Sequence, residues 1–294
     1  MSENLTSILV AIDPSNAGKG AFGQALRMAR FLKAELIAIS VTPRYEGNMH
    51  RWKINDADAQ FSQPFEQCLS EIKAIATEQG QQVRTIHAIG DPVEEILRVA
   101  ETENAGLILM GYPNRSRLER VILGQTTSKV IGHSPCDVLL VPEGSAINFS
   151  RILVGIDGSR YSMEAGQRAL ELALAFGGEV HALTVLVIPM ERSFLYGVME
   201  SARQESFPPL QTLIGQGERF GVRVTTEIIH GAPYEALVQY SERNNIDLIV
   251  LGSYGRTAMA RLLLGSVVER VAMISPRPTL VVKRLGKNGV RDVI

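Results

Sequence analysis

The sequence predicts an α/β protein built from two copies of one unit, each a Rossmann-like, doubly wound sheet of five parallel strands. The first observation is a repeat, because Ile8-Leu-Val-Ala-Ile-Asp13 recurs 144 residues later as Ile152-Leu-Val-Gly-Ile-Asp157. The second is that short β-branched runs alternate with longer amphipathic runs in each copy. Strands that are apolar on both faces and are joined by helices form parallel sheets covered on two sides. We therefore expect a tandem duplication of one α/β unit.

The order of elements follows from the pattern in the first copy. Strands are expected near residues 7–12, 36–41, 82–88, 106–111 and 137–141, and helices near 18–33, 60–79, 92–104 and 117–132. A polar stretch over residues 142–150 separates the copies and gives domains 1–145 and 150–294. In doubly wound sheets ligands bind outside the carboxyl ends of the strands. Residues that follow different strands can therefore share one crevice.

The composition is that of a globular protein without a strong charge. Of 294 residues, 45% are hydrophobic, and 30 Lys plus Arg oppose 31 Asp plus Glu, which leaves a net charge of −1. This balance gives no positive field, so nucleic acid is not an expected partner. No apolar run approaches the roughly 20 residues that span a bilayer, and the start carries no signal core. We expect a cytoplasmic protein that does not enter a membrane.

A glycine loop in the second copy carries the clearest functional signal. Gly252-Ser-Tyr-Gly255 follows an apolar run of strand length, and Gly265-Ser266 precedes a helical pattern that begins at Val267. Glycine permits positive φ and removes the Cβ that would keep a ligand away, and the first amides of a helix attract anions. The spacing predicts a phosphate-binding loop. In a structural alternative, Gly252 ends the strand, Gly255 makes a turn and Ser266 caps the helix.

This loop resembles the ATP-binding loop of the universal stress protein family, and nearly the whole second copy fits the same pattern. In that family a strand ends in an Asp close to the adenosine, and a residue after the second strand offers backbone groups to the adenine. Asp157 and Val185 match those positions. An Asx turn that caps the next helix is an alternative role for Asp157.

The resemblance implies an adenine nucleotide alpha hydrolase-like fold, a role in stress response, and ATP as ligand with Mg²⁺ held through its phosphates. The implied nucleotide-binding residues are Ile156, Asp157, Val185, Gly252, Ser253, Gly255, Arg256, Gly265, Ser266 and Val267.

The first copy departs from this loop. Gly111-Tyr-Pro-Asn114 stands where the second copy has Gly252-Ser-Tyr-Gly255, and Gly124-Gln125 replaces Gly265-Ser266. Asparagine keeps its Cβ, proline lacks an amide donor, and the long glutamine side chain enters the expected phosphate position. We therefore expect one ATP per chain, in the second domain, and a degenerate loop in the first. In the alternative, the asparagine and glutamine supply substitute hydrogen bonds.

No candidate general base or nucleophile accompanies the glycines, so the sequence predicts a binding protein in which ATP is a sensing or regulatory ligand. No pattern with metal-ligand spacing occurs, so no protein-liganded metal is expected. Two other functions stay open. One is a slow ATPase or phosphotransferase that uses Asp157 or an arginine. The other is a nucleotide-independent carrier or scaffold that uses the aromatic middle segments, residues 43–64 and 189–209.

Each copy ends in an apolar strand, residues 138–141 and 279–282, which should lie at the edge of its sheet. Exposed apolar edges invite pairing. Single-unit members of the family that this chain resembles commonly dimerise through that strand. We expect the two strands to run antiparallel beside each other as an intramolecular pseudo-dimer, and a further homodimer stays open.

Overall fold

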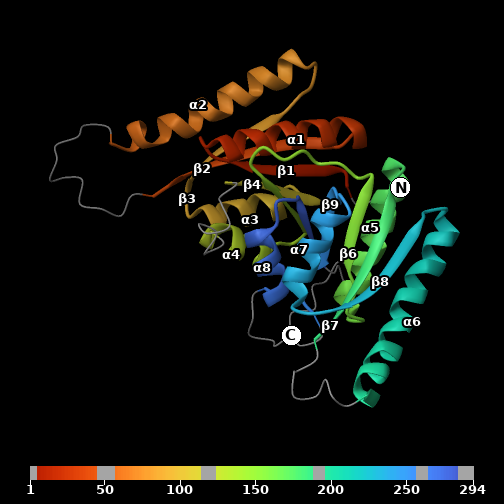
Figure 1. Cartoon of the computed structure of the whole chain (residues 1–294). Helices are drawn as coiled ribbons and strands as arrows, with labels where there is room; N and C mark the ends of the chain where they lie inside the picture. Colours follow the sequence, from red (N-terminus) through yellow and green to blue (C-terminus); the bar gives the residue numbers. More distant parts are fainter. Residues whose placement is uncertain (1–4, 45–56, 114–123, 188–195, 256–263, 284–294) are drawn as a thin grey trace. The chain divides into compact units, whose positions relative to one another are not determined.

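The computed structural model describes residues 5–44, 57–113, 124–187, 196–255 and 264–283, which form two compact units that divide between Gly144 and Ser145 (Figure 1). The elements of the first unit are β1 (Ser7–Ile12), α1 (Asn16–Leu32), β2 (Glu35–Pro43), α2 (Ala57–Glu78), β3 (Arg84–Gly90), α3 (Pro92–Thr102), β4 (Leu107–Tyr112), α4 (Gln125–His133) and β5 (Asp137–Pro142). Those of the second unit are β6 (Arg151–Gly155), α5 (Arg160–Phe176), β7 (Glu179–Leu186), α6 (Tyr196–Phe220), β8 (Val224–His230), α7 (Pro233–Arg243), β9 (Leu248–Gly252), α8 (Ser266–Ile274) and β10 (Thr279–Val282).

Each unit contains five parallel strands in the same order. In the first unit β1 pairs with β2 and β4, β2 pairs with β3, and β4 pairs with β5. In the second unit β6 pairs with β7 and β9, β7 with β8, and β9 with β10. Strands are therefore added first on one side of the first strand and then on its other side. The place beside the first strand where this order reverses is the topological switch point, at which such folds bind ligands. The predicted tandem, doubly wound fold is confirmed.

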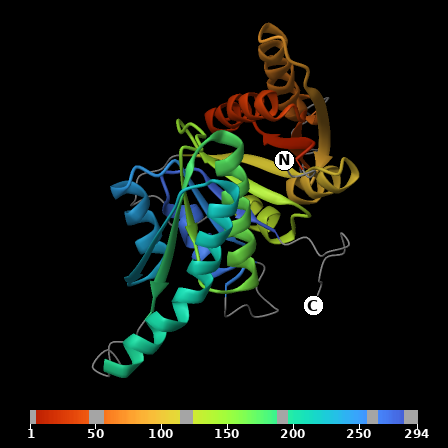
Figure 2. The ribbon, with the colours of Figure 1, turned by 90° about the vertical axis from the view of Figure 1, so that its right-hand side faces the viewer.

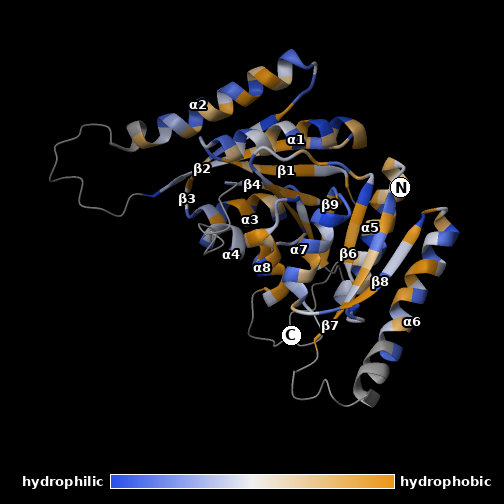
Figure 3. Ribbon diagram, viewed as in Figure 1, coloured by the Kyte–Doolittle hydropathy of each residue, from blue (hydrophilic) through white to orange (hydrophobic). Residues whose placement is uncertain are grey.

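The strands form the core because both of their faces are covered. Ile8, Leu9 and Val10 in β1 and Ile152 and Leu153 in β6 are fully buried. Figure 3 shows apolar residues along these strands, whereas α2 and α6 alternate between polar and apolar residues. In the first unit α1 packs on α2 and α3 on α4. In the second unit α5 lies beside α6, which Figure 2 shows, and α7 packs on α8.

Serine residues begin the first helix of each unit. The Ser15 side chain accepts a hydrogen bond from the Gly18 amide at the start of α1, and the Ser159 side chain accepts one from the Ser162 amide at the start of α5. A hydroxyl at this position satisfies an amide that the helix leaves without a partner. The structure thus repeats the same strand, turn and capped helix in both units.

Two predicted boundaries are corrected by the structure. Of the helix expected over 117–132, residues 117–123 lie outside the described residues, and α4 begins at Gln125 after Gly124, whose φ of −53° and ψ of 136° are not helical. The strand expected from residue 82 begins at Arg84. Of the aromatic middle segments, Phe61 and Phe207 lie exposed on α2 and α6, while Trp52 falls outside the described residues. Within the described ranges, no helix has the length and apolarity required to cross a membrane.

Candidate functional site

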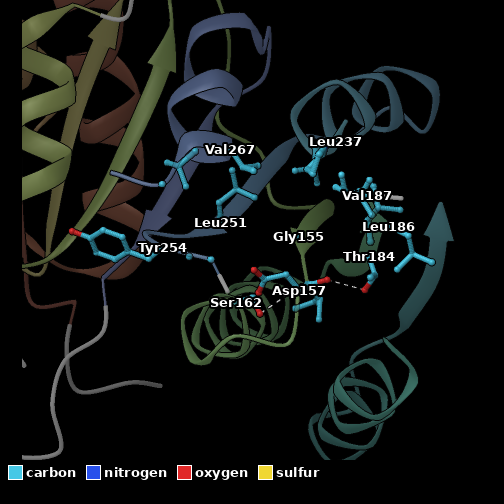
Figure 4. A pocket seen from close by; sticks show the side chains of 18 of the residues that line it. Gly155, Asp157, Ser162, Thr184, Leu186, Val187, Leu237, Leu251, Tyr254 and Val267 are labelled. Atoms are coloured by element: carbon cyan, nitrogen blue, oxygen red, sulfur yellow. Dashed lines mark hydrogen bonds between the residues drawn. The ribbon is translucent and has the colours of Figure 1, made fainter. Parts of the chain in front are cut away.

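A cavity of about 450 Å³ opens in the second unit at the carboxyl ends of its strands, as Figure 4 shows. This volume is in the range of pockets that bind small organic ligands. Its lining comes from four segments: Gly155–Asp157 after β6, Leu183–Val187 in and after β7, the loop after β9, and the start of α8. The remaining lining residues belong to α5, α6 and α7. The cavity therefore lies at the switch point between β6 and β9.

The two helical layers give the cavity walls of different polarity. Leu237 of α7 and Val267 of α8 line one side, and Ser162 of α5 and Glu205 of α6 line the other. In Figure 4, Leu237 and Val267 lie on the side opposite Asp157 and Ser162. The cavity can therefore pack a flat apolar group against one wall and hydrogen-bond a polar group on the other.

Asp157 sits at the centre of the polar wall and is held in place by local hydrogen bonds. Its Oδ1 accepts a hydrogen bond of 2.9 Å from the Ser159 amide, and its own amide donates to Ser162 Oγ at 3.3 Å. The Asx turn expected for Asp157 is present, but Ser159 rather than Asp157 caps α5. A carboxylate fixed in this way offers its second oxygen, Oδ2, toward the loop that contains Gly255.

Thr184 links two of the strands that form the cavity floor. Its Oγ1 donates a 2.8 Å hydrogen bond to the carbonyl of Ile156, just before Asp157. In the first unit Ser40 Oγ donates a 3.1 Å bond to the carbonyl of Ile12 in the same way. The position recurs at the 144-residue offset, so the repeat itself contains a signal for Thr184 that motif reasoning did not use.

The glycines of the loop serve packing more than backbone freedom. Gly252, Gly255 and Gly265 do not have positive φ, so of the two properties that favour glycine the missing Cβ is the one used at these positions. A Cβ on Gly252 would lie 2.5 Å from the backbone carbonyl of Tyr161, so this glycine lets β9 approach α5. A Cβ on Gly255 would lie 2.8 Å from Asp157 Oδ2. Gly255 is therefore the glycine that makes room for a cavity-lining carboxylate.

The loop is closed on itself before α8 begins. The Gly265 amide donates a 3.0 Å hydrogen bond to the Ser253 carbonyl, and the Ser253 amide donates a 3.1 Å bond to Val282 at the end of β10. Gly265 occupies the position before the helix and Ser266 is its first residue, so Ser266 is not the cap. The first amides of a helix have no acceptor within it. Those of Ser266 and Val267 therefore stand at the cavity lining, where an anion would be attracted.

The structure brings together most of the residues that the sequence singled out. Those that line the cavity are Ile156, Asp157, Val185, Gly252, Gly255, Gly265, Ser266 and Val267. Ser253 is buried behind the loop and does not line it. Arg256 lies outside the described residues. Sequence reasoning missed Ser162, Glu205 and Leu237, which come from helices and belong to no motif.

Tyr254 joins the loop to the start of α5. Its ring lies 5.2 Å from that of Tyr161, centroid to centroid, and Lys283 Nζ lies 6.0 Å from the Tyr254 ring centre. Burial, with a smaller effect of Tyr161, raises the pKa of Tyr254 above its ordinary value, so the phenol stays neutral at physiological pH. In Figure 4 its side chain lies on the loop side of the cavity, across from Thr184.

The corresponding crevice of the first unit contains different chemistry. Cys68 Sγ of α2 donates to the carbonyl of Asp13 at 3.4 Å, and Lys19 of α1 pairs with Glu71 of α2 at 2.7 Å. Burial raises the pKa of the Cys68 thiol, which keeps it protonated as a donor. By the repeat offsets, the second unit has Pro209, Met163 and Thr212 at the positions of Cys68, Lys19 and Glu71. Polar contacts thus hold α2 to α1 and to the turn after β1, and the second unit does not repeat the residues that make them.

No group of three or more His, Cys, Asp or Glu side chains suited to a metal ion occurs within the described ranges. The cavity lining nevertheless contains oxygen donors, the Asp157 carboxylate and the Ser266 hydroxyl. These are the ligand atoms that Mg²⁺ prefers. They fit an ion that a phosphate-bearing ligand carries with it.

Comparison with known proteins agrees with this architecture. The sequence model of the universal stress protein family matches the chain twice, over residues 4–142 and 148–283. The chain belongs to the universal stress protein family. Its two units are two copies of the family's domain, which confirms the resemblance that the glycine loop and the Asp157 strand first indicated.

Relatives and solved structures match one or both units of the chain. A universal stress protein of Methanocaldococcus jannaschii is 35% identical over 142 residues, which are 46% of this chain and 83% of that protein. One of Mycobacterium tuberculosis is 25% identical over 306 residues, 94% of this chain and 96% of that protein. The crystal structure of a universal stress protein from Archaeoglobus fulgidus has 23% identity and a TM-score of 0.74, and the match covers 96% of this chain and 97% of that one. The match to the Archaeoglobus fulgidus structure shows that the two chains share a fold.

Proposed function

We propose that this universal stress protein binds ATP in its second unit as a sensing or regulatory ligand. The observation that carries the proposal is the convergence of four segments on one cavity. The end of β6 with Asp157, the end of β7 with Val185, the Gly252–Gly255 loop and the start of α8 all line it. In the sequence no general base or nucleophile accompanies the glycines, which favours binding over turnover.

The walls suggest how the nucleotide lies. An adenine packs between Leu186 and Leu237, where apolar side chains and the backbone of Val185 surround it. The phosphates reach the amides that begin α8 at Ser266, and Mg²⁺ comes with them. Asp157 lies between these two ends, on the side of the sugar. Apolar contact and helix-terminal amides thus act on opposite ends of one ligand.

Mass spectrometry of small molecules released from the purified protein, followed by calorimetry, tests the proposal. We expect one ATP per chain with a Kd in the micromolar range, about −8 kcal/mol. Two sites per chain would contradict the assignment to the second unit alone. No bound nucleotide and no heat of binding would favour the nucleotide-independent carrier or scaffold. Titration with GTP and cyclic AMP in parallel shows whether the site selects adenine triphosphates.

Turnover separates the proposed sensor from a slow ATPase or phosphotransferase. We expect hydrolysis far below the roughly 1–10³ s⁻¹ of typical enzymes. The assay is release of labelled phosphate from Mg–ATP under conditions that saturate the site. A rate of several per second that is lost in Asp157→Ala would establish the enzymatic alternative.

We further propose that β5 and β10 pair antiparallel within the chain as a pseudo-dimer, and that a homodimer can form beyond it. The apolar runs Val138–Val141 and Thr279–Val282 support this, because each is the last strand of its own sheet and an uncovered apolar edge is a liability. Leu140→Pro removes a backbone donor from β5. In thermal unfolding, this variant should show a lower melting temperature than the native chain for both units together. Unchanged melting of the second unit would contradict the pairing.

A further inference from the structure

The polar wall of the second unit's cavity offers hydrogen-bond acceptors and no cation. Asp157 of the β6 end and Glu205 of α6 both line it as carboxylates. Among the described residues that line the cavity, none is Lys or Arg. A group that contacts these two carboxylates must therefore donate hydrogen bonds, and a phosphate there would be repelled by like charge.

Glu205 lies in an unusual turn of its helix. Pro208 and Pro209 are both inside α6. An α-helix bonds the carbonyl of residue i to the amide of residue i+4. Pro209 has no amide hydrogen, so the Glu205 carbonyl does not receive this bond. Glu205 therefore brings two kinds of acceptor, a carboxylate and a carbonyl that the helix does not use in the regular way, to a turn that lines the cavity.

The position of α6 fixes which part of a ligand it can meet. The helix packs on α5, β7 and β8, so it borders the cavity on the side of Asp157 and Thr184. The apolar wall with Leu237 and the amides of α8 lie on other sides. In a nucleotide whose base meets the apolar wall and whose phosphates meet α8, the part left for α6 is the ribose.

We propose that Glu205 accepts a hydrogen bond from a ribose hydroxyl and makes the site selective for nucleotides with a free ribose diol. This inference rests on the proposed function. A carboxylate that binds ribose hydroxyls is how dinucleotide-binding folds reject a phosphorylated ribose, and the same chemistry applies here. The Glu205 side chain is exposed at the cavity, and a sugar that packs beside it would cover it.

The test compares ATP with 2′-deoxy-ATP and 3′-deoxy-ATP by calorimetry on the full-length chain. A hydrogen bond to a charged group corresponds to roughly tenfold or more in affinity. The native protein should therefore bind ATP about tenfold more tightly than at least one deoxy analogue. In Glu205→Ala the affinities for ATP and for that analogue should differ by no more than about twofold. Glu205→Gln, which keeps an acceptor, should retain part of the preference for ATP. The matched control is Glu218→Ala, which removes an exposed carboxylate from the same helix at a position that does not line the cavity. This variant should keep the native ratio of affinities for ATP and the deoxy analogue.

The ratio of affinities distinguishes this role from a general charge effect. Loss of a negative charge near the phosphates would strengthen ATP and both deoxy analogues by the same factor and leave the ratio unchanged. That result, or a native protein that does not discriminate between ATP and either analogue, would overturn the role of Glu205 and leave the proposed ATP site standing. A native protein that binds no ATP would overturn both.

Discussion

Gly255→Ala tests whether the loop glycine serves the cavity or the fold. A Cβ at this position would lie 2.8 Å from Asp157 Oδ2, a separation that real Cβ atoms essentially never show. Either the carboxylate or the loop must move. Asp157 cannot move without a cost, because its Oδ1 holds the Ser159 amide at 2.9 Å and its own amide reaches Ser162 Oγ at 3.3 Å.

The size of the effect follows from this contact. Insertion of one methyl group into a packed site costs typically about 1–3 kcal/mol. Because Gly255 and Asp157 both line the cavity, this cost falls on the geometry that a ligand must meet. Expressed as affinity, it corresponds to about 5- to 150-fold in Kd for ATP. Gly255→Val adds two further methyl groups and should abolish binding.

Calorimetry with ATP and unfolding in urea should be measured on the same preparations. The matched control is Gly215→Ala in α6, where a new Cβ would have no atom within 4 Å. This control should bind ATP as the native chain does and should be slightly more stable, since alanine favours helix. A second control in the first unit, Asn114→Val, at a position outside the described residues, should also change ATP binding little. Native affinity in Gly255→Ala would refute the contact with Asp157 as part of the site.

Two further predictions concern stability. Gly252→Ala should lower the free energy of unfolding by about 2–3 kcal/mol or more, because its Cβ would lie 2.5 Å from the Tyr161 backbone. Unfolding in urea measures this change. Native stability of the variant would show that α5 can move away. The hydrogen bond from Lys19 lowers the pKa of Glu71, so this pair stabilises the fold above the ordinary glutamate pKa and the contribution disappears as pH falls through the lowered pKa. Glu71→Gln should therefore be less stable than the native chain near neutral pH, with a difference that shrinks in acid and in high salt; a difference independent of pH would show that the charge is not its cause.

The fold could be predicted from the sequence because burial on both faces leaves a simple pattern. The run Ile8–Ile12 is apolar at every position, as expected of a strand buried on both faces, and the run that begins at Ile152 repeats this pattern. Helix ends were less accessible. The residues before Gln125 continue a helix-compatible pattern, and only the backbone angles of Gly124 show where α4 begins.

The candidate site could be predicted in part, for a related physical reason. Spacing identifies glycines but does not say what lies beside the missing Cβ. Gly252 faces the backbone of Tyr161, whereas Gly255 faces the Asp157 carboxylate, and this difference depends on how the helix returns to the sheet. Glu205 had no signal, because an exposed glutamate on an amphipathic helix is typical of a solvated face. It becomes a candidate only when α6 is packed at the cavity.

The second helices of the two units differ in the polar contacts that their residues can make. In the first unit α2 is fastened at three places: Cys68 to the Asp13 carbonyl, Lys19 to Glu71, and Glu66 at 3.4 Å from His87, whose other ring nitrogen lies 2.8 Å from Thr42 Oγ1. These contacts join α2 to α1, to the turn after β1, and to β2 and β3.

In the second unit the repeat offsets place Leu186, Phe207 and Ile228 at the positions of Thr42, Glu66 and His87. Apolar side chains cannot form the polar ties of α2, and α6 instead contains two adjacent prolines beside its cavity-lining turn. Leu186, at the position where Thr42 holds the histidine, lines the cavity itself. Leucine in place of threonine at this position therefore removes a hydrogen-bonding group and supplies apolar surface to the cavity of the second unit.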